Sequence, residues 1–294
     1  QTVHQPVRQN CLQCHSRAGG GDSYKRGDLT MAHAATTDRT FDVHMATTGA
    51  NLQCQGCHTF QKHRVSGRGS DLRPTDLDIP MSCSTVTCHP NQSTGEGHKG
   101  NEEITKHVAR VACQTCHIPL YGKNAADTLA TEATEYHRTW AESQQAGTKY
   151  HPLLFLANDV KPVYRFWNRY SWVYNLFDKA VIDQEAGHYA ISRPVGTITD
   201  RDSKLYPFKY KTAEQPFATN KGTLVALDTS IYFRTGDPVA ATKSGLKNMG
   251  YSPAEPFIWV KTDEYQMLNH EVMPRERALK CADCHGTTKQ INLK

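Results

Sequence analysis

The chain contains 294 residues, with a mean hydropathy of −0.63 and a formal net charge of +5. No stretch approaches the roughly 20 consecutive apolar residues that a membrane-spanning helix needs, so we expect no transmembrane segment. The positive charge taken alone would suit acidic partners.

All ten cysteines fall into five pairs, and a histidine directly follows the second cysteine of every pair. In chain order the pairs form site 1 (Cys11-Leu-Gln-Cys14-His15), site 2 (Cys54-Gln-Gly-Cys57-His58), site 3 (Cys83-Ser-Thr-Val-Thr-Cys88-His89), site 4 (Cys113-Gln-Thr-Cys116-His117) and site 5 (Cys281-Ala-Asp-Cys284-His285). Cysteines at i and i+3 project from one face of a helical turn, where they can bond the two vinyl groups of one haem. The histidine at i+4 lies on that face too and becomes the proximal iron ligand. The sequence therefore predicts five covalently attached haem c groups.

Site 3 differs from the others because four residues separate its cysteines. We expect a looped-out turn there that presents the same atoms. Two other uses of cysteine suit the pattern less well. A disulfide framework gives no reason for a histidine after each second cysteine. A structural zinc site needs two pairs that converge on one metal, whereas each pair here stands apart and has its own histidine.

The predicted haems also bear on location and partners. Haem is attached to cysteine outside the cytoplasm, so we expect an extracytoplasmic protein in the periplasm, at the cell surface or outside the cell, with Gln1 beginning a processed chain. Ten propionates add a charge of about −10 and five ferric porphyrins about +5, which brings the oxidised protein close to neutral. We therefore expect redox partner proteins and no nucleic acid.

The spacing of the sites predicts two regions in one integrated unit. Residues 1–117 hold four sites, and residues 118–294 form an aromatic-rich covering region that ends in site 5. We expect a mostly irregular fold with short α-helices, little β-structure and haems forming much of the core. Residues 127–145 have a helical composition, whereas the aromatic run 163–174 suits either a helix or a strand. The four tryptophans of the second region are expected to cover haem faces.

The second axial ligand decides whether a haem passes electrons or binds a substrate, because two strong ligands close the iron. Beyond the five proximal histidines, ten remain, enough to close every haem: His4, His33, His44, His63, His98, His107, His137, His151, His188 and His270. The residues near each site do not by themselves decide which of these bind iron.

Several ordered strings resemble the octahaem tetrathionate reductase family of cytochromes, namely residues 10–15, 18–22, 25–29, 42–45, 111–119, 202–209, 269–274 and 278–285. The resemblance implies an extracytoplasmic protein with closely packed haems that reduces tetrathionate and, in some members, nitrite or hydroxylamine. It further implies distal ligands at five histidines: His44, His63, His98, His107 and His270.

The resemblance covers only the part of the family that bears its last five haems. Three earlier sites have no counterpart before Cys11, and the family's catalytic haem with its lysine ligand falls in that missing portion. Lys25 is the one lysine close behind a motif and a candidate for a catalytic ligand, and Arg26 stands where the family often has histidine.

Two functions follow from these observations. The first is a non-catalytic electron carrier with five bis-histidine haems, either as an electron-transfer subunit or as a homopolymer in an extracellular filament. In the filament, His4 would be the distal ligand of a haem in the next subunit. The alternative is a reductase of small sulfur or nitrogen oxyanions at a labile or lysine-ligated haem, with Lys25 and Arg26 holding the anion.

Overall fold

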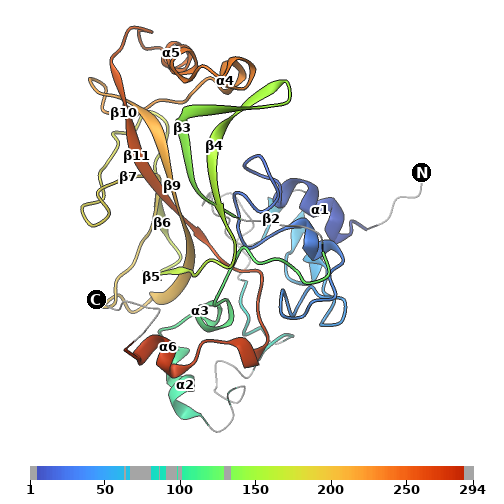
Figure 1. Cartoon of the computed structure of the whole chain (residues 1–294). Helices are drawn as coiled ribbons and strands as arrows, with labels where there is room; N and C mark the ends of the chain where they lie inside the picture. The colour runs from blue at the N-terminus through green and yellow to red at the C-terminus, as the bar shows by residue number, and fades with distance from the viewer. Residues whose placement is uncertain are drawn as a thin grey trace.

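The computed structural model describes residues 5–62, 64–66, 81–85, 87–90, 98, 101–128 and 134–287. In this part of the chain, no helix is both long and apolar enough to cross a membrane. The path of the whole chain is shown in Figure 1.

The segment that holds the first four sites is built from short elements. They are α1 (Arg8–His15), η1 (Met31–Ala34), η2 (Cys54–Gly56), β1 (Phe60–Gln61), β2 (Arg64–Val65), α2 (Glu102–His107) and α3 (Cys113–His117). Site 1 ends α1, and α3 coincides with site 4. Short elements follow again near the C-terminal end, where η4 (Arg275–Arg277) precedes α6 (Cys281–His285). Helix α6 coincides with site 5.

A seven-stranded mixed sheet dominates the second region. Its main path is β4 (Lys149–Ala157), β3 (Thr134–Ala146), β9 (Lys204–Ala218), β11 (Phe257–Met267) and β7 (Tyr189–Ala190), with β5 (Val163–Trp167) and β10 (Thr223–Leu224) also paired to β9. A separate pair joins β6 (Ser171–Val173) to β8 (Ser192–Pro194). The helices α4 (Thr229–Thr235) and α5 (Pro238–Asn248) lie at one end of the sheet, and α3 and α6 lie at the other (Figure 1).

The expected fold class, mostly irregular with short helices and little β-structure, is wrong. Strands β9 and β11 pair antiparallel without a break from Ala218 opposite Phe257 to Phe208 opposite Met267. Their buried aromatic and sulfur-containing side chains pack together with Trp167 in one cluster. Large β-branched and aromatic residues suit a half-buried pleated surface, so the sheet forms its own core.

The same sheet corrects the expected helix at residues 127–145 and decides between helix and strand for residues 163–174. Most of the segment with helical composition, residues 127–145, forms β3, because pairing with β4 and β9 outweighs weak local helix propensity. The aromatic run 163–174 contains strands β5 and β6. Trp167 packs edge to face against Tyr206 and Phe208, so this ring belongs to the core of the sheet.

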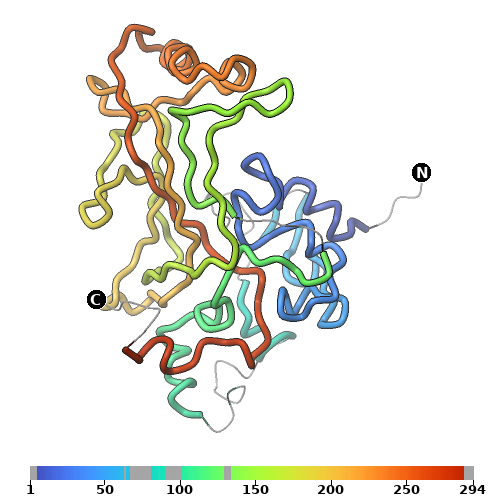
Figure 2. The backbone as a smooth tube through the Cα atoms, viewed as in Figure 1, coloured from blue at the N-terminus to red at the C-terminus, as the bar shows by residue number. Residues whose placement is uncertain are grey.

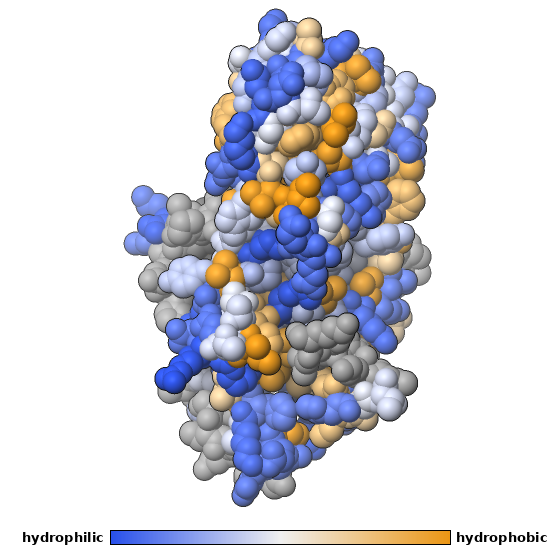
Figure 3. All heavy atoms as spheres, turned by 90° about the vertical axis from the view of Figure 1, so that its left-hand side faces the viewer, coloured by the Kyte–Doolittle hydropathy of each residue, from blue (hydrophilic) through white to orange (hydrophobic). Residues whose placement is uncertain are grey.

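The two regions meet along the return path of the chain. After β11 the backbone runs beside the early segments, where Val43 N–H donates to Val272 O and Met273 N–H donates to His117 O. Figure 2 shows this red C-terminal segment descending from the sheet toward α3 and α6. On the face shown in Figure 3, apolar side chains are scattered among polar ones.

Candidate haem-binding sites

The fold brings a second histidine close to the proximal histidine at three of the sites. The ring centroids of His44 and His89 are 6.1 Å apart, those of His58 and His270 are 6.3 Å apart, and those of His107 and His285 are 5.9 Å apart. Two imidazoles that bind one iron from opposite sides have centroids about 6 Å apart, from metal–nitrogen bonds of about 2 Å and about 1 Å from each nitrogen to its ring centre. These separations fit one iron between each pair.

At site 4, His98 lies near the proximal histidine His117. Burial lowers the pKa of His117, and the charge of the nearby His98 lowers it further. Burial likewise lowers the pKa of His44 and of His58. Metal binds the neutral imidazole, so these environments hold the rings in the form that coordinates iron.

Hydrogen bonds at Nδ1 orient several of these rings. His58 Nδ1 lies 3.0 Å from Ser66 O, and His107 Nδ1 lies 2.6 Å from Glu103 O. The ring of His117 makes a hydrogen bond with the backbone of Met273. A ring that donates from Nδ1 to a carbonyl leaves Nε2 as the free ligand atom, which is the usual arrangement of a metal-bound histidine.

His270 is oriented by a carboxylate. Its Nδ1 lies 3.2 Å from Asp28 Oδ2, and the same oxygen accepts the backbone N–H groups of Asn269 at 2.7 Å and His270 at 3.0 Å. Arg26 pairs with the other oxygen, Oδ1, at 3.4 Å. Burial of Asp28 opposes ionisation, but the charges of Arg26 and His270 and these hydrogen bonds outweigh it and hold the pKa of Asp28 well below its usual range.

Cysteines of consecutive sites lie beside one another. Burial and a hydrogen bond with Cys11 raise the pKa of Cys54 to about 11, which places site 1 against site 2. Burial and the nearby Cys88 raise the pKa of Cys57, which places site 2 near site 3.

The same relation continues to the end of the series. Cys83 shares a hydrogen bond with Cys113, which joins site 3 to site 4. Burial and the neighbouring Cys284 raise the pKa of Cys116 to about 11, so site 4 lies near site 5. The five sites therefore follow one another in space in the order of the chain.

The long loop of site 3 presents its histidine as the shorter motifs do. At site 2, His58 N–H donates to the carbonyl of the first cysteine, Cys54, at 2.8 Å. At site 3, His89 N–H donates to Cys83 O at 3.1 Å, although two more residues intervene. A turn closed by Cys88 N–H on Thr85 O takes up the extra length.

Other candidate residues from the sequence have different surroundings. His4 and His63 lie outside the described residues. The guanidinium of Arg26 is engaged by Asp28 and by Met267 O at 3.1 Å. Lys25 lies in the loop after site 1, where its N–H donates to Ala18 O.

Three of the remaining described histidines, His33, His137 and His188, have polar partners away from the cysteines. His33 is fully buried between Thr30 and Asp42, and His137 contacts Thr212 Oγ1 at 2.7 Å. His188 Nδ1 lies 3.1 Å from Tyr210 Oη. Within the described ranges, no group of three or more His, Cys, Asp or Glu side chains is arranged to hold a metal ion.

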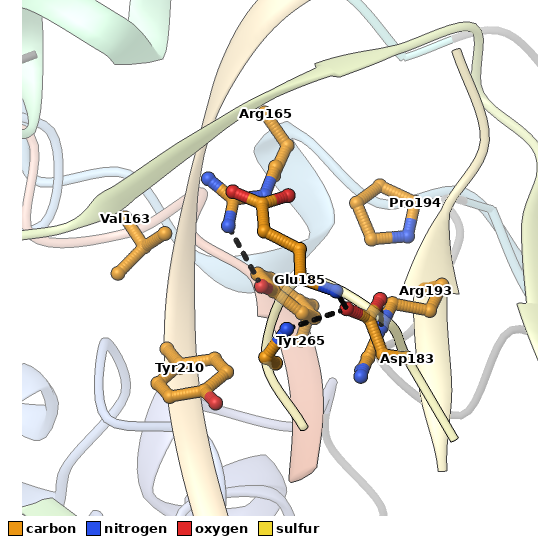
Figure 4. Close-up of a pocket in the computed structure, with 9 residues that line it drawn as sticks. Val163, Arg165, Asp183, Glu185, Arg193, Pro194, Tyr210 and Tyr265 are labelled. Atoms are coloured by element: carbon orange, nitrogen blue, oxygen red, sulfur yellow. Dashed lines mark hydrogen bonds and ion pairs between the residues drawn. The ribbon is translucent and has the colours of Figure 1, made fainter. Parts of the chain in front are cut away.

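The sheet also carries a cavity of about 400 Å³ (Figure 4). Arg165 donates to Tyr265 Oη at 3.1 Å in its wall, and Arg193 pairs with Asp183 at 2.8 Å. The guanidinium groups of Arg165 and Arg193 lie 5.4 and 5.2 Å from the centre of the Tyr265 ring. Sequence reasoning did not single out these residues.

The donor set fits haem c. Each described site offers two thiols for thioether bonds and one histidine, and at sites 2, 3 and 5 a second imidazole lies beside that histidine. When bound, the haem supplies an iron centre that takes up and releases one electron. The protein contributes the covalent anchors, the axial ligands and the hydrogen bonds that orient them.

Comparisons with known proteins agree with this chemistry. The family described as bacterial cytochrome c matches residues 124–288. An octahaem cytochrome c from Shewanella oneidensis, solved by crystallography, is similar in structure with a TM-score of 0.78 and 29% sequence identity. The match covers 98% of this chain and 65% of that one, so this chain spans about two thirds of the relative's length. No curated protein matches.

Bacterial c-type cytochromes usually work outside the cytoplasm, which agrees with the expected location. The likeness to an octahaem cytochrome adds that haem groups are multiple. The chain belongs to the bacterial cytochrome c family and is a multihaem c-type cytochrome with covalently bound haem, serving electron transfer or another haem-based redox reaction.

Proposed function

We propose that the chain conducts electrons along five haem c groups held in the order of sites 1 to 5. The observation that carries this proposal is that cysteines of consecutive sites lie near one another, with hydrogen bonds between Cys11 and Cys54 and between Cys83 and Cys113. Each haem is bonded to its cysteines, so neighbouring cysteines bring neighbouring porphyrins close together. A continuous series of haems gives an electron a path from one end of the chain to the other.

We assign four of the axial pairs as His270 with site 2, His44 with site 3, His98 with site 4 and His107 with site 5. The ring separations at sites 2, 3 and 5 and the electrostatic contact at site 4 support these assignments. Two strong ligands close an iron to substrate, so these four haems would transfer electrons without binding oxyanions. This favours the carrier over a reductase at those sites.

The distal ligand of site 1 is proposed as His63 from the same chain or His4 from a neighbouring copy. In the second case the protein would polymerise into an extracellular filament. A further arrangement is an electron-transfer subunit that docks on a catalytic partner. The resemblance to tetrathionate reductases concerns the whole octahaem protein, and this chain matches only part of such a length.

Two measurements on the purified holoprotein test the proposal. Intact mass should show the polypeptide plus five haem groups. Electron paramagnetic resonance of the oxidised protein should show low-spin signals only. A high-spin signal, or carbon monoxide binding to the reduced protein, would overturn the carrier and favour an oxyanion reductase at the open haem.

A further inference from the structure

The partner of His270 distinguishes site 2 from sites 4 and 5. His58, His107 and His117 direct their rings to backbone oxygens, whereas His270 Nδ1 faces the carboxylate of Asp28 at 3.2 Å. A carboxylate is a stronger acceptor than a neutral carbonyl and draws the Nδ1 proton away from the ring. The imidazole then becomes a stronger electron donor at Nε2.

The carboxylate is held rigidly and out of water. The side chain of Asp28 is 0% exposed, and three donors converge on its Oδ2, namely the N–H groups of Asn269 and His270 and the His270 ring. Arg26 approaches the other oxygen at 3.4 Å. A carboxyl group that only accepts hydrogen bonds is in its anionic form.

We propose that Asp28 is a positioning residue that strengthens His270 as a ligand and gives the haem of site 2 the lowest reduction potential among sites 2 to 5. This inference rests on the proposed pairing of His270 with His58. Both axial ligands of site 2 then have oriented Nδ1 protons, one held by Ser66 O and the other by Asp28. Electron donation and a fixed negative charge both stabilise ferric over ferrous iron.

The low potential of the site 2 haem would affect electron flow because site 2 lies within the series of haems. Site 2 lies between site 1 and site 3, since Cys54 contacts Cys11 and Cys57 lies near Cys88. Electron transfer onto a haem of low potential at this point is energetically unfavourable. Asp28 would therefore set the rate at which electrons cross from one end of the series to the other.

Arg26 makes the proposal testable in two directions. In Asp28→Asn the amide keeps the shape and an oxygen for the His270 ring but removes the negative charge. In Arg26→Gln the carboxylate stays and loses its compensating cation. We expect the reduction potential of the site 2 haem to rise in Asp28→Asn and to fall in Arg26→Gln. Each change should alter the ratio of reduced to oxidised haem about tenfold, which corresponds to about 59 mV for one electron.

The matched control is Asp263→Asn. Asp263 is as deeply buried as Asp28, but its partners are Arg193, Tyr210 and His188 on the sheet. Potentials are measured by spectroelectrochemical titration of the holoprotein, and spin states by electron paramagnetic resonance. The control should leave all potentials unchanged, and the two test variants should stay low-spin with shifted g values for one haem.

Unchanged potentials in a low-spin Asp28→Asn protein would overturn the proposal. If Asp28→Asn instead lost His270 as a ligand, the Arg26→Gln variant would become the test. An unaltered or raised site 2 potential in Arg26→Gln would then overturn the proposal. His270→Ala separates this inference from the ligand pairing. One new high-spin haem in His270→Ala upholds the pairing, whereas a protein that stays wholly low-spin contradicts the pairing itself.

Discussion

Lys123 and Glu271 form a buried pair at the junction of the two regions. Lys123 Nζ donates to Glu271 O at 3.1 Å, and Lys123 N–H donates to the Glu271 carboxylate at 3.2 Å. The same ammonium donates to Thr40 O at 2.9 Å and Phe41 O at 2.6 Å. One side chain thus joins three segments far apart in sequence, next to the proposed ligand His270.

Replacing Lys123 with Met should destabilise the protein strongly. The change removes the donor of three backbone carbonyls, those of Thr40, Phe41 and Glu271, and leaves them without this hydrogen bond. We expect a loss of about 3–5 kcal/mol in the free energy of unfolding, measured by urea denaturation. Lys221→Met is the control, because Lys221 is partly exposed and its ion pair with Glu255 spans 3.9 Å. A loss in Lys123→Met no larger than in the control would contradict this role.

Removing a proposed distal ligand should open one haem only. His107 lies 5.9 Å from His285 between ring centroids, so His107→Ala should convert the site 5 haem from low-spin to high-spin. His188→Ala is the control, since His188 contacts Tyr210 and Asp263 on the sheet. Electron paramagnetic resonance checks both variants. The assignment fails if both spectra match that of the unaltered protein.

The double variant Cys83→Ser and Cys88→Ser should remove one haem from the middle of the series. Intact mass should fall by one haem group relative to the unaltered holoprotein. Because Cys83 contacts Cys113 and Cys88 lies near Cys57, the gap would separate site 2 from site 4. Electron transfer between the two ends, followed by stopped-flow absorbance, should slow sharply. Equal rates would show that electrons do not pass through site 3.

Acid should destabilise the fold through its buried carboxylates. Burial opposes ionisation of Asp42, but hydrogen bonding and charge from His33 hold its pKa below the ordinary value of 3.8. The folded protein then binds fewer protons than the unfolded chain near this pH, so stability is full above about pH 4 and falls as pH drops through the lowered pKa.

The variant Asp42→Asn isolates this contribution. Urea denaturation between about pH 5 and pH 3 should show a shallower loss of stability for the variant than for the unaltered protein. Parallel pH profiles would mean that Asp42 has the same pKa in both states.

The aromatic core of the sheet should matter for stability without changing haem ligation. Phe208 is 1% exposed and packs with Trp167, Tyr206 and Tyr265. Phe208→Ala should cost about 3–5 kcal/mol of unfolding free energy, whereas Ile258→Ala, at a side chain 52% exposed, should cost less than about 0.5 kcal/mol. Calorimetry measures the first effect, and an unchanged low-spin spectrum in Phe208→Ala would show that the haems keep their ligands. A high-spin haem would instead tie this core to a haem site.

The sequence alone was sufficient for the chemistry of attachment. Each of the five Cys-His motifs predicts the two cysteines that bond one haem and the histidine that is its proximal ligand. All three residues come from one short stretch of chain. The spare histidines likewise predict closed irons, which stays a prediction. These inferences rest on the spacing of cysteine and histidine along the chain, which can be read from the sequence.

The tertiary structure decided the rest. His270 precedes site 5 in sequence but lies beside His58 of site 2, whereas His107 lies beside His285 of site 5. A distal ligand comes from the opposite side of the porphyrin, so long-range packing selects it. The sheet was missed for a similar reason. The helical composition of residues 127–145 is a weak local preference, and pairing of β3 with β4 and β9, visible only in the folded chain, outweighs it.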